Sequence, residues 1–324
     1  MNGTITDING IRVGHAQNEE ALTGCTVILC ESGVMAGVDV RGAAPGTRET
    51  DLLHPMKMMD RVHAILLSGG SAYGLDAAGG VMKYLEENGA GFDVGVARVP
   101  IVPAAVLFDL MIGDPSIRPD AEMGYEACRK ASGEPVLQGN VGAGTGAAVG
   151  KLLGFRYAMK SGIGSASIQI GGGIRVAAIV AVNAFGDVVD PETRKILAGV
   201  RKPVVGGFAD SAKMLLGDLN NLIAGFHTNT TIGVVATDAR LTKPQAARVA
   251  QMAHNGYART IQPVHTEYDG DTIFALSCGS KKGDVNAIGF AAVQVIEQAV
   301  INAVKHAGTA GGLPSWSSIG SLIK

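Results

Sequence analysis

The chain has 324 residues, a formal net charge of −2 at pH 7, 47% hydrophobic residues and 17% charged residues. This balance gives no electrostatic footprint for nucleic acid or an anionic membrane, so neither is expected as a partner. The four cysteines form no CxxC pair, the N-terminus lacks a signal pattern and no apolar run approaches a transmembrane length, so we expect reduced thiols and a cytoplasmic location.

Short apolar runs alternate with helical patterns along the chain. Several runs are apolar on both parities, which indicates sheets covered on both faces. Strands are predicted at residues 25–30, 34–40, 62–67, 174–182, 231–237 and 272–276. Helices are predicted to follow cap residues Ser71, Thr242 and Asp284. These elements fit two packed sheets with outer helices in one domain, 1–324, although the pattern alone leaves a parallel α/β order open.

The segment 227–239 runs from a polar turn directly into a β-branched strand, with Asn229 and Thr230 at the junction. A Thr hydroxyl is a weak nucleophile until a base activates it, and an N-terminal Thr carries its own α-amine as that base. The layout therefore suits a chain that cuts its backbone before Thr230. The same residues also fit an ordinary turn that feeds a strand.

Other blocks extend this pattern, namely residues 69–77, 142–146, Lys151 and 261–274. Together with residues 229–238, they resemble the L-aminopeptidase/D-esterase family, which includes β-peptidyl aminopeptidases and nylon-oligomer hydrolases. The resemblance runs from about Gly24 to about Lys305. It implies an α/β fold, a four-layer αββα sandwich, and an autoprocessed N-terminal-nucleophile hydrolase. Cleavage between Asn229 and Thr230 would give pieces 1–229 and 230–324.

Two carboxylates, those of Asp269 and Asp271, lie downstream of Thr230 in the sequence. On a strand edge they would point to the same side and raise each other's pKa, whereas a solvated Asp-Gly-Asp turn is the plainer reading. The resemblance implies that they orient the Thr230 hydroxyl, as in the nylon-oligomer hydrolases. It also places Lys151 near that hydroxyl and makes Asn183 a donor to the oxyanion. By pattern alone, Lys151 reads as a solvated lysine and Asn183 as a turn residue.

One position departs from the resemblance. Some relatives carry a catalytic-site Tyr in the block 105–109, where this chain has Phe108. The missing hydroxyl bears on substrate range more than on the nucleophile. Tyr73 could line the pocket instead, or its ring could pack beneath the neighbouring glycine turn.

The familiar cofactor motifs fail. The His residues show no ligand spacing, and Leu152 stands where a P-loop needs Ser or Thr, so no metal or organic cofactor is expected. The resemblance implies a homo-oligomer of cleaved protomers. It also implies a small substrate: a short peptide, an amino-acid amide or ester, or a 6-aminohexanoate oligomer. Two alternatives stay open, an acyl transferase like the ornithine acetyltransferases and a processed, non-catalytic binding protein.

Overall fold

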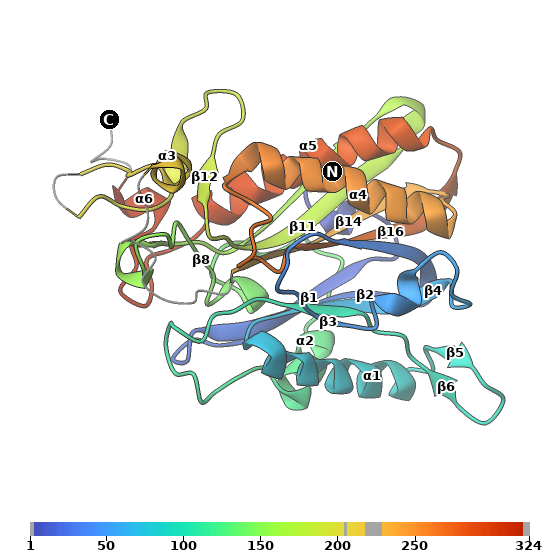
Figure 1. Ribbon diagram of the computed structural model, residues 1–324. Coiled ribbons are helices and arrows are strands. Elements are labelled where there is room, and N and C mark those ends of the chain that lie inside the picture. The colour runs from blue at the N-terminus through green and yellow to red at the C-terminus, as the bar shows by residue number, and fades with distance from the viewer. Residues whose placement is uncertain (1–2, 204–205, 218–228, 320–324) are drawn as a thin grey trace.

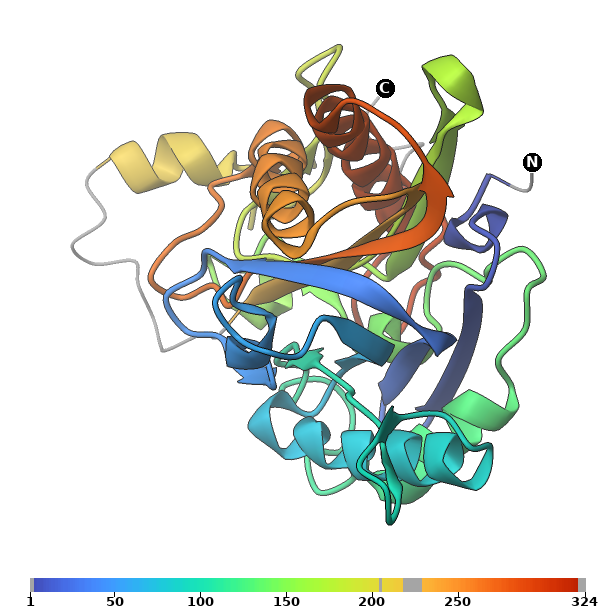
Figure 2. The same ribbon diagram turned by 90° about the vertical axis from the view of Figure 1, so that its right-hand side faces the viewer.

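The computed structural model describes residues 3–203, 206–217 and 229–319. Its elements lie in four layers (Figure 1). Helices α1 (Ala77–Glu87) and α2 (Ala121–Arg129) cover one outer side, and α4 (Lys243–Thr260) and α5 (Val285–Lys305) cover the other. The strands fill the two layers between the helix pairs, as the turned view in Figure 2 also shows. The predicted αββα sandwich is therefore confirmed.

The strands follow one hydrogen-bonded path, β10-β11-β14-β16-β2-β4-β7-β3, with β1 paired to β2. The path folds into two layers at the 18-residue strand β2 (Thr23–Val40). Residues 25–29 and 34–35 of β2 pair with β4, and residues 35–40 pair with β16. The register shifts between Leu29 and Val34, where Gly33 has a φ of +73°. The two strands predicted here are thus one strand with an irregularity at its centre.

The other main strands are β1 (Arg12–Asn18), β3 (Gly46–Arg48), β4 (Arg61–Ser68), β7 (Ala104–Val106), β10 (Ile163–Gln169), β11 (Arg175–Asn183), β14 (Thr230–Ala239) and β16 (Thr272–Lys281). Small pairings lie outside the main path, and they comprise β5 (Phe92–Asp93) with β6 (Arg98–Val99), β8 (Ala148–Val149) with β9 (Met159–Lys160), and β12 (Asp187–Val189) with β13 (Ile196–Ala198) and β15 (Ile261–Gln262). Short helices complete the described chain, namely α3 (Ser211–Leu216), α6 (Trp316–Ile319) and 3-10 turns at Ile5–Asp7, Asp51–Leu53, Ser71–Asp76, Gly142–Gly144, Phe155–Tyr157 and Gly171–Gly173.

The three largest apolar clusters of the described residues fill the three spaces between the layers. The middle cluster joins the two sheets and includes Leu67, Ile179, Val234 and Phe274. The other two lie beneath the helix pairs α1–α2 and α4–α5. Burying each large aliphatic or aromatic side chain contributes roughly 1.5–3 kcal/mol relative to exposure. Strands that are apolar on both parities therefore follow from sheets covered on both faces.

Two of the three predicted helix starts are confirmed. Thr242 and Gln245 form the capping box of α4, and the Asp284 carboxylate accepts the Ala287 N–H at 2.9 Å to begin α5. The third prediction is wrong, because α1 begins at Ala77. Ser71 has a φ of +55° and starts a 3-10 turn without capping it. Left-handed backbone at this point turns the chain before a regular helix can start.

Helix α5 is long and apolar enough to cross a membrane, with a mean hydropathy of 1.5 over its best window. However, 67% of that window is buried inside the protein. Ala299, Val300 and Val304 belong to the cluster shared with the sheet. This burial is typical of the core helix of a globular protein.

Candidate active site

Thr230 is the first residue of β14, and its side chain is 4% exposed. Side chains alternate along a strand, and Ile232 and Val234 on the same parity belong to the cluster between the sheets. The Thr230 side chain therefore faces the space between the sheets. Thr231, on the other parity, faces the layer of α4 and α5. The predicted turn-to-strand junction at this point is confirmed.

The Thr230 hydroxyl lies beside the peptide carbonyl that precedes it. Oγ1 of Thr230 donates to the Asn229 carbonyl oxygen at 2.5 Å. The Gly270 N–H donates to the same oxygen at 2.8 Å, and the Asn229 N–H donates to the Tyr268 carbonyl at 2.7 Å. Two segments far apart in sequence thus run side by side here. An N–H aimed at a peptide carbonyl is the element of an oxyanion hole.

Sequence reasoning missed Gly270, whose lack of a side chain is required. A Cβ at this position would lie 2.8 Å from Thr230 Oγ1 and 2.7 Å from the Ala44 carbonyl oxygen. Real Cβ atoms are almost never this close to other heavy atoms. The glycine between the two aspartates was visible in the sequence, but only the fold shows that it faces the Thr230 hydroxyl.

Asn183 ends β11 directly opposite Thr230 in the antiparallel register. Cross-strand partners point to the same face, so the Asn183 amide and the Thr230 hydroxyl share the space between the sheets. The amide oxygen accepts from Lys151 Nζ at 2.6 Å and from the Ala148 N–H at 3.1 Å. Its Nδ2 donates to the Phe108 carbonyl at 2.8 Å. The structure thus brings Lys151 and Asn183 together beside Thr230. Contrary to what the sequence pattern alone indicates, Lys151 is not a solvated lysine and Asn183 is not a turn residue.

Lys151 is buried, with 5% of the residue exposed. Burial lowers the pKa of its ammonium to about 7, while the negative charges of Asp269 and Asp109 act in the opposite direction. A group with this pKa can hold or release a proton near neutral pH. Lys151 is therefore equipped for proton transfer as well as for orienting the Asn183 amide.

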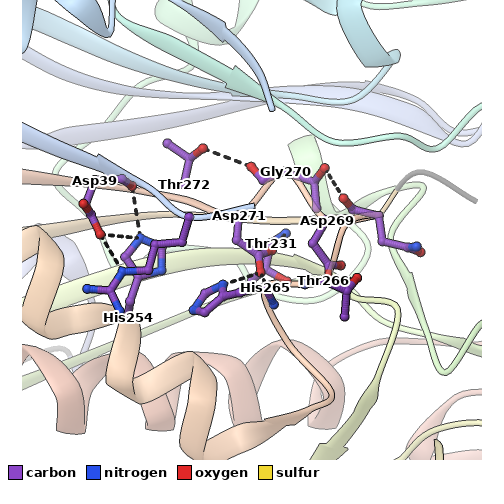
Figure 3. Close-up of polar contacts among 12 residues, drawn as sticks. Asp39, Thr231, His254, His265, Thr266, Asp269, Gly270, Asp271 and Thr272 are labelled. Atoms are coloured by element: carbon purple, nitrogen blue, oxygen red, sulfur yellow. Dashed lines mark hydrogen bonds and ion pairs between the residues drawn. The ribbon is translucent and has the colours of Figure 1, made fainter. Parts of the chain in front are cut away.

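The Asp269 carboxylate is 98% shielded and is held by one neighbour. Its Oδ2 accepts from the Thr266 N–H at 2.8 Å and from the Thr266 hydroxyl at 2.6 Å (Figure 3). Burial and, to a smaller degree, the charge of Asp271 raise the pKa of Asp269 to about 6. The bonds from Thr266 and the charge of Lys151 oppose this rise. Asp269 and Lys151 thus titrate close together.

Asp271 has different partners from Asp269. Its Oδ1 accepts the Thr231 N–H at 2.7 Å, and its Oδ2 lies 2.8 Å from Nδ1 of His265 (Figure 3). The two aspartates directly precede β16, and Asp269 forms a parallel β-bridge with Asn229. In the part of the chain that the structure describes, the Thr230 hydroxyl donates to the Asn229 carbonyl and not to either carboxylate. A direct bond to that hydroxyl stays a prediction.

Other buried polar groups near the site were missed by sequence reasoning. Asp109 accepts from the Gly70 N–H and the Thr23 hydroxyl, both at 2.7 Å, and burial raises its pKa. Lys160 donates to backbone carbonyls, and burial lowers its pKa to about 7. No short motif marks either residue. Asp109 directly follows Phe108, the residue singled out in the sequence analysis.

The two predicted pocket residues lie differently. Phe108 is partly buried, and its backbone carbonyl contacts the Asn183 amide. The Tyr73 ring is 60% exposed, with the Arg118 guanidinium 4.1 Å above its centroid. The Tyr73 ring therefore does not pack beneath the glycine turn. Its exposed position leaves the pocket role open.

Within residues 3–203, 206–217 and 229–319, no group of three or more His, Cys, Asp or Glu side chains is arranged to hold a metal ion. The polar side chains around Thr230 instead make hydrogen bonds with one another and with the backbone. A buried hydroxyl, a lysine, an amide and two carboxylates thus gather at the end of a central strand, and groups of these kinds can catalyse amide hydrolysis.

Solved structures share this fold. An L-aminopeptidase/D-Ala-esterase/amidase from Ochrobactrum anthropi, described as a variant of the Ntn hydrolase fold, matches with a TM-score of 0.72 and 21% identity over 97% of this chain and 88% of that one. A β-aminopeptidase from Burkholderia sp. matches with a TM-score of 0.69 and 22% identity over 99% and 94% of the two chains.

Sequence comparison gives the family. The profile of peptidase family S58 matches residues 3–315. An uncharacterized aminopeptidase of Mycobacterium tuberculosis is 42% identical over 97% of this chain and 96% of the relative. A 6-aminohexanoate-oligomer endohydrolase of Kocuria sp. is 32% identical over 92% and 85%. The chain belongs to peptidase family S58 and is a peptide or amide hydrolase.

Proposed function

We propose that this hydrolase cuts its own chain between Asn229 and Thr230 and then uses the new N-terminal Thr230 as its nucleophile. One observation carries the proposal. The Thr230 hydroxyl and the Gly270 N–H meet on the oxygen of the Asn229 carbonyl. The attacking group and a donor to the developing oxyanion are therefore both in place around this peptide bond.

Self-cleavage begins when Thr230 Oγ1 bonds to the Asn229 carbonyl carbon and gives its proton to a base. The negative charge moves to the carbonyl oxygen, where the Gly270 N–H stabilises it. The C–N bond then breaks, and the Thr230 nitrogen takes up a proton to become the free amine. Water hydrolyses the resulting ester, with its hydroxyl joining the Asn229 carboxyl group and its proton returning to Oγ1.

Lys151 and Asp269 are the proton carriers in this proposal. The pKa is about 7 for Lys151 and about 6 for Asp269, so both groups can exchange protons near neutral pH. Lys151 donates to the amide oxygen of Asn183, and Asn183 is the cross-strand partner of Thr230. Asp271 fixes the peptide on the other side of the nucleophile through the Thr231 N–H. The chemistry therefore uses groups on both sides of one residue.

The mature enzyme repeats the same steps on a substrate amide and passes through an acyl-enzyme. The Thr230 α-amine becomes an additional base, and the Asn183 amide assists the oxyanion. The substrate is the N-terminal residue of a short peptide, an amino-acid amide or ester, or a 6-aminohexanoate oligomer. The last class is suggested by the 32% identity to the Kocuria endohydrolase.

Denaturing mass spectrometry of the purified protein tests the cleavage. Pieces 1–229 and 230–324 are expected, with Thr230 at the new N-terminus. Thr230→Val keeps the side-chain shape without the hydroxyl and should leave one uncut chain. Thr231→Val is the matched control, because it removes a hydroxyl from the opposite face of β14, and it should still cleave. Cleavage of the Thr230→Val chain at the same bond would refute the assignment.

A substrate panel separates the proposed activity from its alternatives. Amino-acid p-nitroanilides, a β-dipeptide and a 6-aminohexanoate dimer test hydrolysis. N-acetylornithine with glutamate tests acyl transfer of the ornithine acetyltransferase type. Transfer of acetyl to glutamate without hydrolysis of any amide would favour the transferase. A cleaved chain that turns over none of these compounds would favour a binding protein.

We also propose that cleaved protomers assemble into a homo-oligomer. Large apolar side chains are exposed around the β5–β6 hairpin and the segment before β4, including Met56 at 85%, Met58 at 78% and Val96 at 95%. Exposed apolar groups of this kind often mark contact surfaces. Light scattering coupled to gel filtration measures the assembly, and a monomer at micromolar concentration would contradict it.

A further inference from the structure

A second polar cluster lies behind the nucleophile, on the helix side of the sheet. It consists of His254 and Tyr257 from α4 together with His265 and Asp271 from the segment before β16 (Figure 3 shows all but Tyr257). The ring centroids of His254 and His265 are 4.9 Å apart, and those of His254 and Tyr257 are 5.5 Å apart. The proposed mechanism assigns no step to any of these three rings.

His265 binds the same carboxylate oxygen with two groups. Its Nδ1 lies 2.8 Å and its backbone nitrogen 3.2 Å from Oδ2 of Asp271. The other oxygen of Asp271 accepts the Thr231 N–H at 2.7 Å. A continuous chain of bonds therefore leads from His265 through Asp271 to the peptide that follows Thr230.

The surroundings indicate which ring nitrogen carries hydrogen. The carboxylate of Asp271 is an acceptor, so Nδ1–H of His265 donates to it. His254 is enclosed, and its Nε2 faces the Asp39 carbonyl at 3.0 Å and the Asp39 carboxylate at 3.6 Å. Burial lowers the pKa of His254 to about 4, so the ring is neutral at pH 7. Arg41 neutralises Asp39 through a 2.7 Å ion pair.

His265 also has an unusual backbone, with a φ of +56°. Left-handed backbone is unfavourable for most side chains, and Asn, Asp and His adopt it more often than the others. The strained backbone allows the N–H and the ring of one residue to reach the same carboxylate oxygen. Such strain is typical of positions where a precise orientation is needed.

We propose that His265 is a positioning residue of the reaction. It fixes the rotamer of Asp271, which in turn holds the Thr231 peptide and thereby sets the direction of the Thr230 hydroxyl. This inference rests on the proposed function, because it assumes that Thr230 is the nucleophile. Misplacement of a reacting group by about 1 Å can lower a rate by about 10²-fold.

Two substitutions at His265 distinguish a hydrogen-bonding role of the ring from a packing role. His265→Asn keeps a donor at the place of Nδ1 and tolerates the left-handed backbone. His265→Gly removes the donor while relieving the backbone. We expect self-cleavage and kcat to fall about 10²-fold in His265→Gly with little change in KM, and to stay within about threefold of the parent in His265→Asn. Added imidazole should partly restore the Gly variant.

Two outcomes overturn the proposal. In one, His265→Gly is as fast as the parent, and in the other, both variants lose activity equally. His63→Asn is the matched control, because it replaces another buried imidazole, on β4 in the other sheet, whose Nδ1 accepts the Ile101 N–H. This control should keep the parent rate per folded molecule.

A spectroscopic measurement covers the case in which the Gly variant does not fold. Nitrogen-15 NMR of the parent should show hydrogen on Nδ1 of His265, and hydrogen on Nε2 alone would overturn the assignment. The parent is also assayed for cleavage and turnover. A parent that is neither cut nor active refutes the proposed function itself, whereas an active parent beside an equally active Gly variant refutes only the role of His265.

Discussion

Two buried lysines near the site look alike by burial and differ in what they touch. Lys151 and Lys160 are 5% and 0% exposed, and burial lowers the pKa of each to about 7. Among the residues that the structure describes, Lys160 donates to the backbone carbonyls of Gly144, Ala147 and Ser161 and to no side chain. Lys151 donates to the backbone and to the side-chain oxygen of Asn183, the cross-strand partner of Thr230.

A perturbed pKa alone therefore does not identify a functional lysine. Asp109 acts on both ammonium groups, whereas Asp269 acts on Lys151. Backbone carbonyls fix a loop but cannot exchange protons with a substrate. Lys151 instead donates to the amide of Asn183, which lies opposite Thr230, and the charge of Asp269 acts on it. We therefore propose that Lys151 takes part in the chemistry and that Lys160 stabilises the fold.

The largest expected effect comes from Lys151→Met, which keeps the side-chain stem and removes the charge. Loss of a positioned proton-transfer group lowers rates by about 10²–10⁴-fold. Self-cleavage and turnover should slow together, because both use the Thr230 hydroxyl. Timed gel analysis of fresh protein and steady-state assays measure the two rates. A parent-like rate in both assays would end the distinction between the lysines.

Lys160→Met should change stability instead of rate. Removing the donor leaves buried carbonyl groups unpaired, at a cost of about 1–3 kcal/mol. The lowered pKa of Lys160 also predicts the direction in which its contribution to stability changes with pH. Between pH 7 and pH 10.5 the unfolded lysine binds more protons than the folded one, so the parent should gain stability relative to Lys160→Met as pH rises. Denaturant titrations across this range measure the difference, and a flat difference would contradict it.

Asn183→Ala tests whether the partner of Lys151 contributes to the reaction. Removing one oxyanion donor lowers kcat by roughly 10²–10³-fold in a measured precedent. We expect a fall in kcat that exceeds the rise in KM. Asn140→Ala is a suitable control, because Asn140 bonds the Gly308 backbone in an exposed position. A change confined to KM would assign Asn183 to substrate binding.

The pH profile sharpens the role of the carboxylate near Lys151. Burial raises the pKa of Asp269 to about 6, so the rate should rise as pH rises through about 6 and fall about tenfold per unit below it. Asp269→Asn should lose this acid limb and retain its stability, because Thr266 can still donate to the amide oxygen. Asp114→Asn, at an exposed carboxylate, should keep the limb.

The smallest effect is expected from a substitution at the exposed residue Tyr73. Tyr73 is exposed and stacked with Arg118, an arrangement that contributes about 0.5–1 kcal/mol at exposed sites. Tyr73→Ala should therefore change KM by less than about fivefold. Steady-state kinetics with the best substrate of the panel measure this. A loss of kcat would place Tyr73 among the reacting groups.

Local patterns predicted most of the elements and the turn-to-strand junction at Thr230 but not the contacts around that residue. The apolar periods, the capping box at Thr242 and the strand start at Thr230 are short-range features that a sequence displays directly. The Gly270 N–H on the Asn229 carbonyl and the Asp271 carboxylate on the Thr231 N–H join segments about 40 residues apart. Only the strand register brings them together, and no spacing rule encodes that register.

The order of the central strands has a consequence for a chain cut before Thr230. The strands β14 and β16 of the C-terminal piece lie between β11 and β2 of the N-terminal piece. Helices α4 and α5 of the C-terminal piece also cover strands of both pieces. Neither fragment could leave without dismantling the sheet, so a nicked protomer should melt in one transition and should not dissociate on dilution. The cut would free an amine while the interleaved sheet keeps the molecule whole.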